Sequence, residues 1–368
     1  MKVAFFIGHH KTGSTALQTY LAENYLTLLR EGILYPAVEA QGSAANLAAA
    51  FTGQVNPDDT QRLNVREPHN ALAFRMLNEA AKLPVPVWHP NLPSSEQMLH
   101  LIAAQIESLH PKQMVICSEV MSGLSDDGWR KTLPQMQRHF SVHECTIVLN
   151  LRRPDHHIAS LHMHRLKLLQ RVKPLRDGGH TAYYDTRHFR FDRVVERWSE
   201  AFPNARFHVR NYADVVAAGG SVQDFFAQSG IGHTPVETGK RANVSFPHAL
   251  AEIMRQAIQQ SPETGKRVRA YLLRAMERVT CVPNDQVELF GEANRTALCD
   301  AFAPVHTALS QRLGVEAFFP DIELARQCNP VPELQAARQA LVELKEDSAK
   351  HLKPGPVRAF LSGLKIEG

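Results

Sequence analysis

The sequence predicts an α/β protein with a central parallel sheet and a helical C-terminal extension. Three observations support this class: short apolar runs that favour strands, helical patterns between those runs, and no convincing strand after about Gln223. Apolar runs with little alternation are typical of strands buried on both faces. Strands that alternate with helices predict βαβ units. The 368 residues suffice for one large domain with a helical appendage.

Five segments rich in β-favouring residues are the expected strands. They are Val3–Ile7, Gly32–Tyr35, Gln113–Cys117, Cys145–Leu151 and Arg206–Val209. Apolar residues at helical spacing predict the helices of this part. These helices are Thr15–Arg30, Ser95–Leu109, Asp127–His139 with an interruption at Pro134, His156–Leu169 and Phe191–Ala201. The Gly- and Pro-containing stretches Pro36–Pro68 and Leu83–Pro93 are expected to be connectors or insertions.

The last third of the chain has helical patterns alone. The expected helices are Ala249–Gln260, Arg267–Val279, Gln286–Leu313 with a break near Pro304, and Glu333–His351. We therefore expect an α/β domain over residues 1–245 and a helical region over residues 246–368, which could pack on the same domain.

Composition excludes several classes of protein. Apolar residues make up 44% of the chain and charged residues 21%, which is typical of a globular protein. A formal charge of +4 is too small to indicate nucleic-acid binding, and no apolar run reaches the roughly 18 residues of a membrane span. Five cysteines without a CxxC pair fit a reducing, cytoplasmic location. The histidines lack a metal-ligand spacing such as HExxH, so no metal is expected.

A polar loop, Gly8–Thr15 (GHHKTGST), follows the first predicted strand. It keeps the GxxxxG frame and final Thr of a Walker A loop, but Ser14 stands where the Walker lysine belongs, and Lys11 lies inside the loop. A strand-to-helix turn of small residues lets backbone N–H groups face one anion, and the helix N-terminus adds about half a positive charge. We therefore predict a P-loop-like three-layer fold with an anion site here; the alternative is a plain βα connection.

A second basic segment follows the fourth predicted strand. Arg152 would lie at the carboxyl end of that strand, Pro154 suits the first turn of the next helix, and Ser160 lies on the second turn. Ligands of open α/β sheets bind at such strand ends, where an Arg offers a bidentate fork to phosphate. The alternative is that Arg152 and Arg153 only pair with acids such as Asp155.

Together these residues resemble the sulfotransferase family, which uses 3′-phosphoadenosine 5′-phosphosulfate as donor. One signature of that family is a PKxGTT-like loop, matched by His10–Thr15, and the other is an RxP segment with a serine eight residues after the Arg, matched by Arg152, Pro154 and Ser160. The resemblance covers about residues 1–245. It departs from the usual pattern at His10, where Pro is common, and at Ser14, where Gly or Thr is commoner.

The resemblance implies which residues hold the donor. The 5′-phosphosulfate would be bound by the loop residues Lys11, Thr12, Gly13, Ser14 and Thr15, and the 3′-phosphate by Arg152 and Ser160. A late basic segment often closes over the nucleotide in this family, which makes Lys240 and Arg241 candidates for a further contact. The sequence looks most like bacterial members related to carbohydrate sulfotransferases, so the hydroxylated acceptor could be a carbohydrate.

Sulfonyl transfer to a hydroxyl needs a base, while a lysine can stabilise the leaving phosphate. Lys11 fits the second role. Glu119 follows the third predicted strand and would stand at the same edge of the sheet as the donor, so it is the candidate base. His10 is the rival base, because an unperturbed histidine titrates near neutral pH.

Two other functions remain open on the sequence. A nucleotide-dependent phosphotransferase is disfavoured because the loop lacks the Walker lysine after Gly13, and because no apolar strand ends in a Walker B Asp. A donor-binding scaffold without activity is the non-enzymatic alternative.

Overall fold

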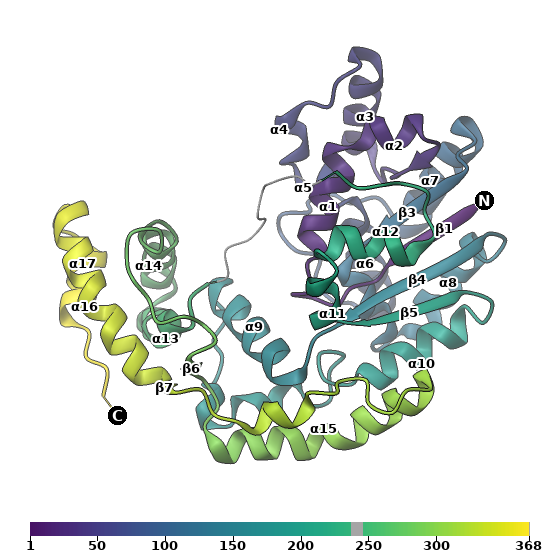
Figure 1. Ribbon diagram of the computed structural model, residues 1–368. Helices are drawn as coiled ribbons and strands as arrows, with labels where there is room; N and C mark the ends of the chain where they lie inside the picture. Colours follow the sequence, from purple (N-terminus) through teal and green to yellow (C-terminus); the bar gives the residue numbers. More distant parts are fainter. Residues whose placement is uncertain (237–245, 368) are drawn as a thin grey trace. The chain divides into compact units, whose positions relative to one another are not determined.

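The computed structural model describes residues 1–236 and 246–367, and these residues form an α/β fold with a five-stranded parallel sheet (Figure 1). The chain divides into two compact units. Unit 1 comprises Met1–Arg152, Asp185–Asn243 and Val305–Phe318, and unit 2 comprises Arg153–Tyr184, Val244–Pro304 and Phe319–Gly368. Among the helices of the described residues, none has the length and apolar character that crossing a membrane would require.

The sheet lies in unit 1 and contains all five expected strands. They are β1 (Lys2–Phe6), β2 (Ile33–Leu34), β3 (Gln113–Cys117), β4 (Glu144–Leu151) and β5 (Arg206–Asn211). Their order across the sheet is β2-β3-β1-β4-β5, and all neighbours are parallel. The central strand β1 therefore lies between β3 and β4, which explains why its apolar residues are buried on both faces.

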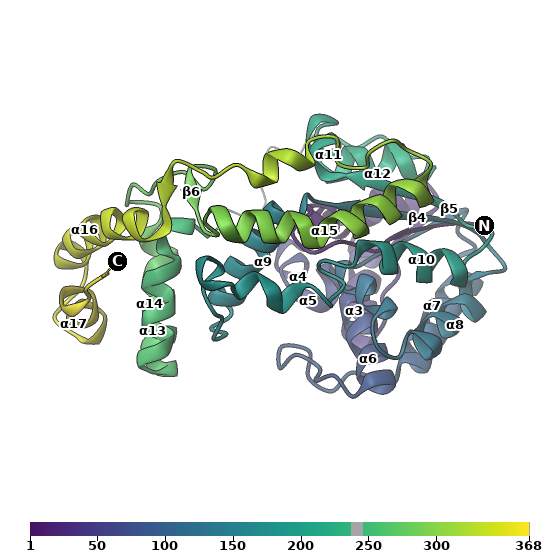
Figure 2. The ribbon, with the colours of Figure 1, turned by 90° about the horizontal axis from the view of Figure 1, so that it is seen from below.

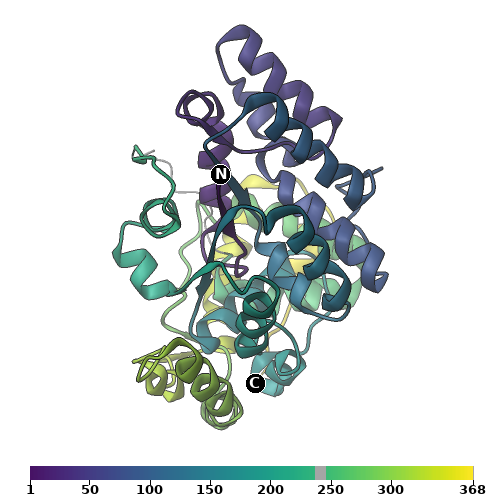
Figure 3. The same cartoon turned by 90° about the vertical axis from the view of Figure 1, so that its right-hand side faces the viewer.

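Helices cover both faces of this sheet (Figure 3). On one face, Phe6 of β1 packs in a core with α1 (Ser14–Glu23), α2 (Tyr25–Arg30) and α12 (Ser221–Ser229). On the other face, Phe5 packs edge-on against Phe140 of α8 (Trp129–Phe140) and lies beside Trp198 of α10 (Phe191–Ala201). Successive side chains of β1 point to opposite faces of the sheet and so contribute to a hydrophobic core on each side, as a three-layer arrangement requires.

Unit 1 contains further helical elements. They are α3 (Ala40–Thr52), α4 (Pro57–Thr60), α5 (Leu63–Arg66), α6 (Pro68–Ala81), α7 (Ser95–Leu109), the 3₁₀ helix η1 (Glu119–Ser125) and α11 (Tyr212–Ala217). The stretch Pro36–Pro68 is largely helical rather than irregular. Glu39 caps α3 by accepting hydrogen bonds from two backbone N–H groups, and the alanine-rich sequence that follows favours helix.

Unit 2 is mainly helical. Its elements are α9 (Pro154–Lys167), η2 (Leu175–Asp177), η3 (Gly179–Tyr183), η4 (His248–Leu250), α13 (Ala251–Gln260), α14 (Pro262–Ala275), β6 (Val287–Glu288), η5 (Ile322–Arg326), β7 (Val331–Pro332), α16 (Glu333–His351) and α17 (Pro356–Gly363). Helices α13, α14, α16 and α17 pack together (Figure 2). A buried hydrogen bond of 2.7 Å from the Tyr271 hydroxyl to Asp347 joins α14 to α16.

Four other details differ from the sequence predictions. The expected helix Thr15–Arg30 is divided at Asn24 into α1 and α2. Two expected interruptions are absent, because α8 continues through Pro134 and α15 (Glu292–Leu313), which contributes residues to both units, continues through Pro304. The buried side chains of α8 on either side of Pro134 offset the one backbone hydrogen bond that a proline removes. The short parallel pair β6–β7 also lies in the expected strand-free region.

Candidate functional site

The topology of the sheet places the candidate site at the carboxyl ends of β1 and β4. From β1 the chain crosses to β2 on one side, whereas from β4 it continues to β5 on the other, so the strand order reverses between these neighbours. Open α/β sheets bind ligands at such a reversal. Backbone pairing continues past the strands, because His9 N–H donates to Asn150 O (2.9 Å) and Asn150 N–H donates to Gly8 O (2.8 Å).

The loop after β1 has a conformation suited to an anion. Lys11 and Gly13 have positive φ values of 65° and 86°, and Thr12 between them does not, so the sign of φ alternates. Alternating backbone handedness turns successive N–H groups toward one side. Thr12 is buried, and its hydroxyl donates to His9 O at 2.6 Å, which closes the loop.

Helix α1 begins against this loop without a capping side chain or an acidic residue in its first turn. The backbone N–H groups of Ser14 and Thr15 have no acceptor within the described residues. The loop therefore offers a site suited to an anion. Its positive character comes from these N–H donors, the N-terminal end of α1 and the Lys11 ammonium group.

His9 holds the loop in place rather than carrying a charge. Its Nδ1 accepts a hydrogen bond from the His10 N–H at 3.1 Å, which leaves Nε2 to donate to Arg187 O at 3.0 Å. Burial, and then the charge of Arg187, lower the pKa of His9 to about 3. The ring of His10 lies 5.4 Å from the ring of His188 and is partly exposed.

Arg152, at the end of β4, lies beside the loop. Its guanidinium carbon is 5.7 Å from the centre of the Tyr212 ring, and a Cβ placed on Gly13 would be 3.9 Å from that ring. Ser221, the first residue of α12, donates from its hydroxyl to Gly13 O at 2.8 Å. Arg152 and the loop therefore both lie next to Tyr212, within one unit.

Arg153 pairs with acidic side chains, as the alternative to a phosphate-binding role predicts. It is buried and forms a bidentate ion pair with Asp155, at 2.8 and 3.0 Å, and a further pair with Asp321 at 2.6 Å. Ser160 is buried on α9, in unit 2, whereas Arg152 and the loop belong to unit 1. Lys240 and Arg241 lie outside the described residues.

Glu119 lies beside the loop, as the strand order requires. Gly8 has a φ of 116°, and a Cβ there would be 3.0 Å from the backbone oxygen of Glu119, so the chain after β1 touches the chain after β3. The Glu119 carboxylate accepts hydrogen bonds from Gln18 (3.2 Å) and Asn70 (3.4 Å). Burial, and then the charge of Glu67, raise the pKa of Glu119, while hydrogen bonds from Ser14 and Asn70 oppose this rise.

Polar side chains connect these carboxylates. Asn70 donates to Glu67 at 2.9 Å as well as to Glu119, and its oxygen accepts from the Ser118 hydroxyl at 2.6 Å. The buried network fixes the orientation of Glu119. A carboxylate held in a fixed orientation with a raised pKa is a stronger base than an exposed carboxylate.

A groove in unit 1 has a volume of about 260 Å³. Its polar and aromatic lining residues include Glu39, Gln41, Asn64, Trp88, His89 and Asn91. Burial lowers the pKa of His89, and the charge of Glu67 opposes this shift. The charge of Glu67 therefore affects the pKa of both His89 and Glu119.

Four residues of the site were not expected from the sequence: Glu67, Asn70, Tyr212 and Ser221. The first two lie in a region expected to be irregular or left unassigned. Tyr212 directly follows β5, and Ser221 follows the Gly219-Gly220 turn. The two glycines are the sequence signal that a new helix begins here, near the carboxyl edge of the sheet. Comparisons with protein families, with curated proteins and with solved structures find no match to this chain.

Proposed function

We propose that the protein is a sulfotransferase that moves a sulfonyl group from 3′-phosphoadenosine 5′-phosphosulfate to a hydroxyl acceptor. The observation that carries this proposal is the pair of cationic strand ends, Lys11 in its N–H-rich loop and Arg152, with Tyr212 next to both the loop and Arg152. Two separated cationic sites suit a ligand with two separated anionic groups. The fold in this proposal is P-loop-like, with the lysine moved inside the loop.

The donor is expected to bind with its 5′-phosphosulfate at the loop. Lys11 and the N–H groups of Ser14 and Thr15 supply positive charge and donors for it, and Thr12 and Gly13 maintain the loop conformation. The 3′-phosphate is assigned to Arg152. The proposed chemistry assigns no step to a metal ion.

The reaction follows from these positions. The acceptor oxygen forms a bond to sulfur as the bond from sulfur to the 5′-phosphate oxygen breaks. Glu119 takes the acceptor proton, and Lys11 stabilises the charge that develops on the leaving phosphate. Its raised pKa makes Glu119 a stronger base than an exposed carboxylate.

The acceptor is expected in the groove that contains Trp88 and His89. The Trp88 side chain is half exposed and offers an apolar face, while Glu39, Gln41 and Asn64 supply hydrogen-bonding groups. An aromatic face beside amides and a carboxylate suits an uncharged polyol, in line with a carbohydrate acceptor.

The test is transfer of labelled sulfonyl groups from the donor to a panel of hydroxylated sugars, lipids and small metabolites. A labelled product that is absent with Glu119→Gln and formed in the presence of a metal chelator supports the proposal. Donor binding without transfer to any acceptor would favour a scaffold. Magnesium-dependent phosphate transfer from a nucleotide would instead favour a kinase.

A further inference from the structure

A second cavity lies within unit 2, and none of its lining residues has a role in the proposed reaction. Its volume is about 320 Å³, near the lower end of the roughly 300–1,000 Å³ that small-molecule sites occupy. The walls come from the segment between α9 and η2 and from α13. The lining residues are Gln170, Arg171, Val172, Lys173, Pro174, Arg255, Ile258 and Gln259.

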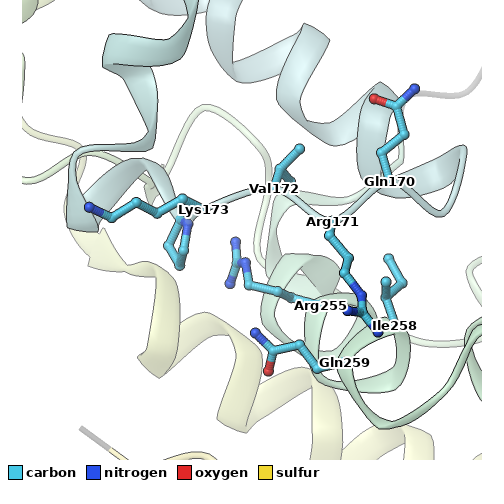
Figure 4. Close-up of a pocket in the computed structure, with 8 residues that line it drawn as sticks. Gln170, Arg171, Val172, Lys173, Arg255, Ile258 and Gln259 are labelled. Atoms are coloured by element: carbon cyan, nitrogen blue, oxygen red, sulfur yellow. The ribbon is translucent and has the colours of Figure 1, made fainter.

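The spacing of three of these residues explains the shape of one wall. Arg255, Ile258 and Gln259 are three and four positions apart in α13, so they share one face of that helix. Figure 4 shows the side chain of Arg171 extending toward Ile258 and Gln259, while Gln170 and Lys173 extend away on opposite sides. Val172, Pro174 and Ile258 add apolar surface.

The lining contains cations and amides but no carboxylate. Arg255 is buried and balanced, because it pairs closely with Glu252 and lies 3.1 Å from Glu333. The same two carboxylates also hold Arg176, so two guanidinium groups face two carboxylates. These ion pairs hold the Arg255 side chain in place as part of the cavity lining. Its Nε is buried without an acceptor in the described part of the chain.

Arg171 and Lys173 are not balanced in this way. Both are exposed, and neither forms an ion pair with a carboxylate of the described residues. A cavity lined by cations without a carboxylate partner, by amide donors and by apolar walls favours an organic anion over a neutral ligand or a cation.

We propose that this cavity binds a small organic oxyanion, with the oxyanion at the Arg171 guanidinium and Gln259 amide and the organic body against Val172, Pro174 and Ile258. Sulfate esters, phosphate esters and carboxylates all carry an oxyanion of this kind. The proposal does not rest on the sulfotransferase assignment, since every residue in it belongs to unit 2.

The test is calorimetric titration of the full chain carrying Lys11→Ala, Arg152→Ala and Trp88→Ala, so that neither the loop nor the Trp88 groove of unit 1 contributes to binding. The probes are glucose 6-sulfate, glucose 6-phosphate, glucuronate and uncharged glucose. At least one charged sugar should bind, and glucose should not. The charged sugar that binds most tightly identifies the oxyanion.

Matched variants locate the binding. Gln259→Glu adds a carboxylate to the lining and should weaken binding at least about tenfold, as should Arg171→Gln. Gln260→Glu adds the same charge at the next, exposed position, which does not line the cavity, and should have little effect. The proposal is overturned if no charged sugar binds with a Kd below about 10 mM, if glucose binds equally well, or if Gln259→Glu and Gln260→Glu behave alike.

Discussion

The guanidinium carbon of Arg152 lies 5.7 Å from the centre of the Tyr212 ring. The same ring lies against Gly13, at the start of α1. An arginine over an aromatic face gains cation–π attraction and is restricted in its movement. Tyr212 thus positions the arginine of one strand end relative to the loop at the other.

Tyr212→Leu should weaken binding of 3′,5′-adenosine bisphosphate, the product of the proposed reaction. Loss of a cation–π contact of about 0.5–2 kcal/mol corresponds to roughly 2- to 30-fold in affinity. Tyr212→Phe keeps the ring and should bind nearly as well as the unchanged protein. Titration calorimetry measures both, and equal losses in the two variants would show that the ring does not support Arg152.

Gly13→Ala should destabilise the protein and abolish donor binding. Gly13 has a φ of 86°, and a Cβ there would lie 2.5 Å from the Ser221 hydroxyl oxygen. Gly53→Ala is the matched control, because Gly53 has a φ of 72° but no atom within 4 Å of the added Cβ. Denaturant unfolding should show a loss of about 1–2 kcal/mol for Gly53→Ala and a larger loss for Gly13→Ala. Equal losses would mean that Ser221 does not constrain the loop.

The sequence was sufficient for the parts of the fold that local patterns determine. The apolar runs of β1, β3 and β4 and the glycine-bounded loop are local features, and strand ends meet at one edge of any parallel sheet. The residues that complete the site depend on tertiary contacts. Asn70 and Tyr212 come from helices far from the loop in sequence, and no short-range pattern connects them to Glu119 or Arg152.

The acid limb of the pH–rate profile should report Glu119. Its pKa is raised by burial and then by Glu67, so turnover should fall as pH decreases through that raised value. Glu67→Gln removes one of the two causes and should move the acid limb to lower pH. Glu144→Gln, at the opposite end of β4, is the control. An acid limb that keeps its position in Glu67→Gln, or that disappears in His10→Ala, would contradict the assignment of the base to Glu119.

Acid should destabilise the fold through buried neutral histidines. The pKa of His69 is lowered to about 3, chiefly by burial, and its Nδ1 accepts from the Cys117 N–H at 3.1 Å. The unfolded chain binds the proton more tightly, so stability present above about pH 6.5 is lost as pH falls toward 3. His69 should contribute roughly 1.4 kcal/mol per pH unit to this loss.

His69→Asn keeps an acceptor for the Cys117 N–H but does not titrate. It should reduce the slope of unfolding free energy between about pH 4 and 6, whatever its effect on stability at neutral pH. His100→Asn changes an exposed histidine and should leave the slope unchanged. Denaturant unfolding at several pH values measures this slope, and equal slopes in the two variants would contradict the assignment.

Titration of 3′,5′-adenosine bisphosphate into the unchanged protein and Arg152→Ala tests the two-site account of donor binding most directly. Arg152→Ala should weaken binding by about 2–4 kcal/mol, the cost of removing one partner of a charged hydrogen-bonded pair. Lys11→Ala should weaken binding as well, whereas Arg206→Ala, at the amino end of β5, should not. Equal affinity of the unchanged protein and Arg152→Ala would contradict the assignment of the bisphosphate to the ends of β1 and β4.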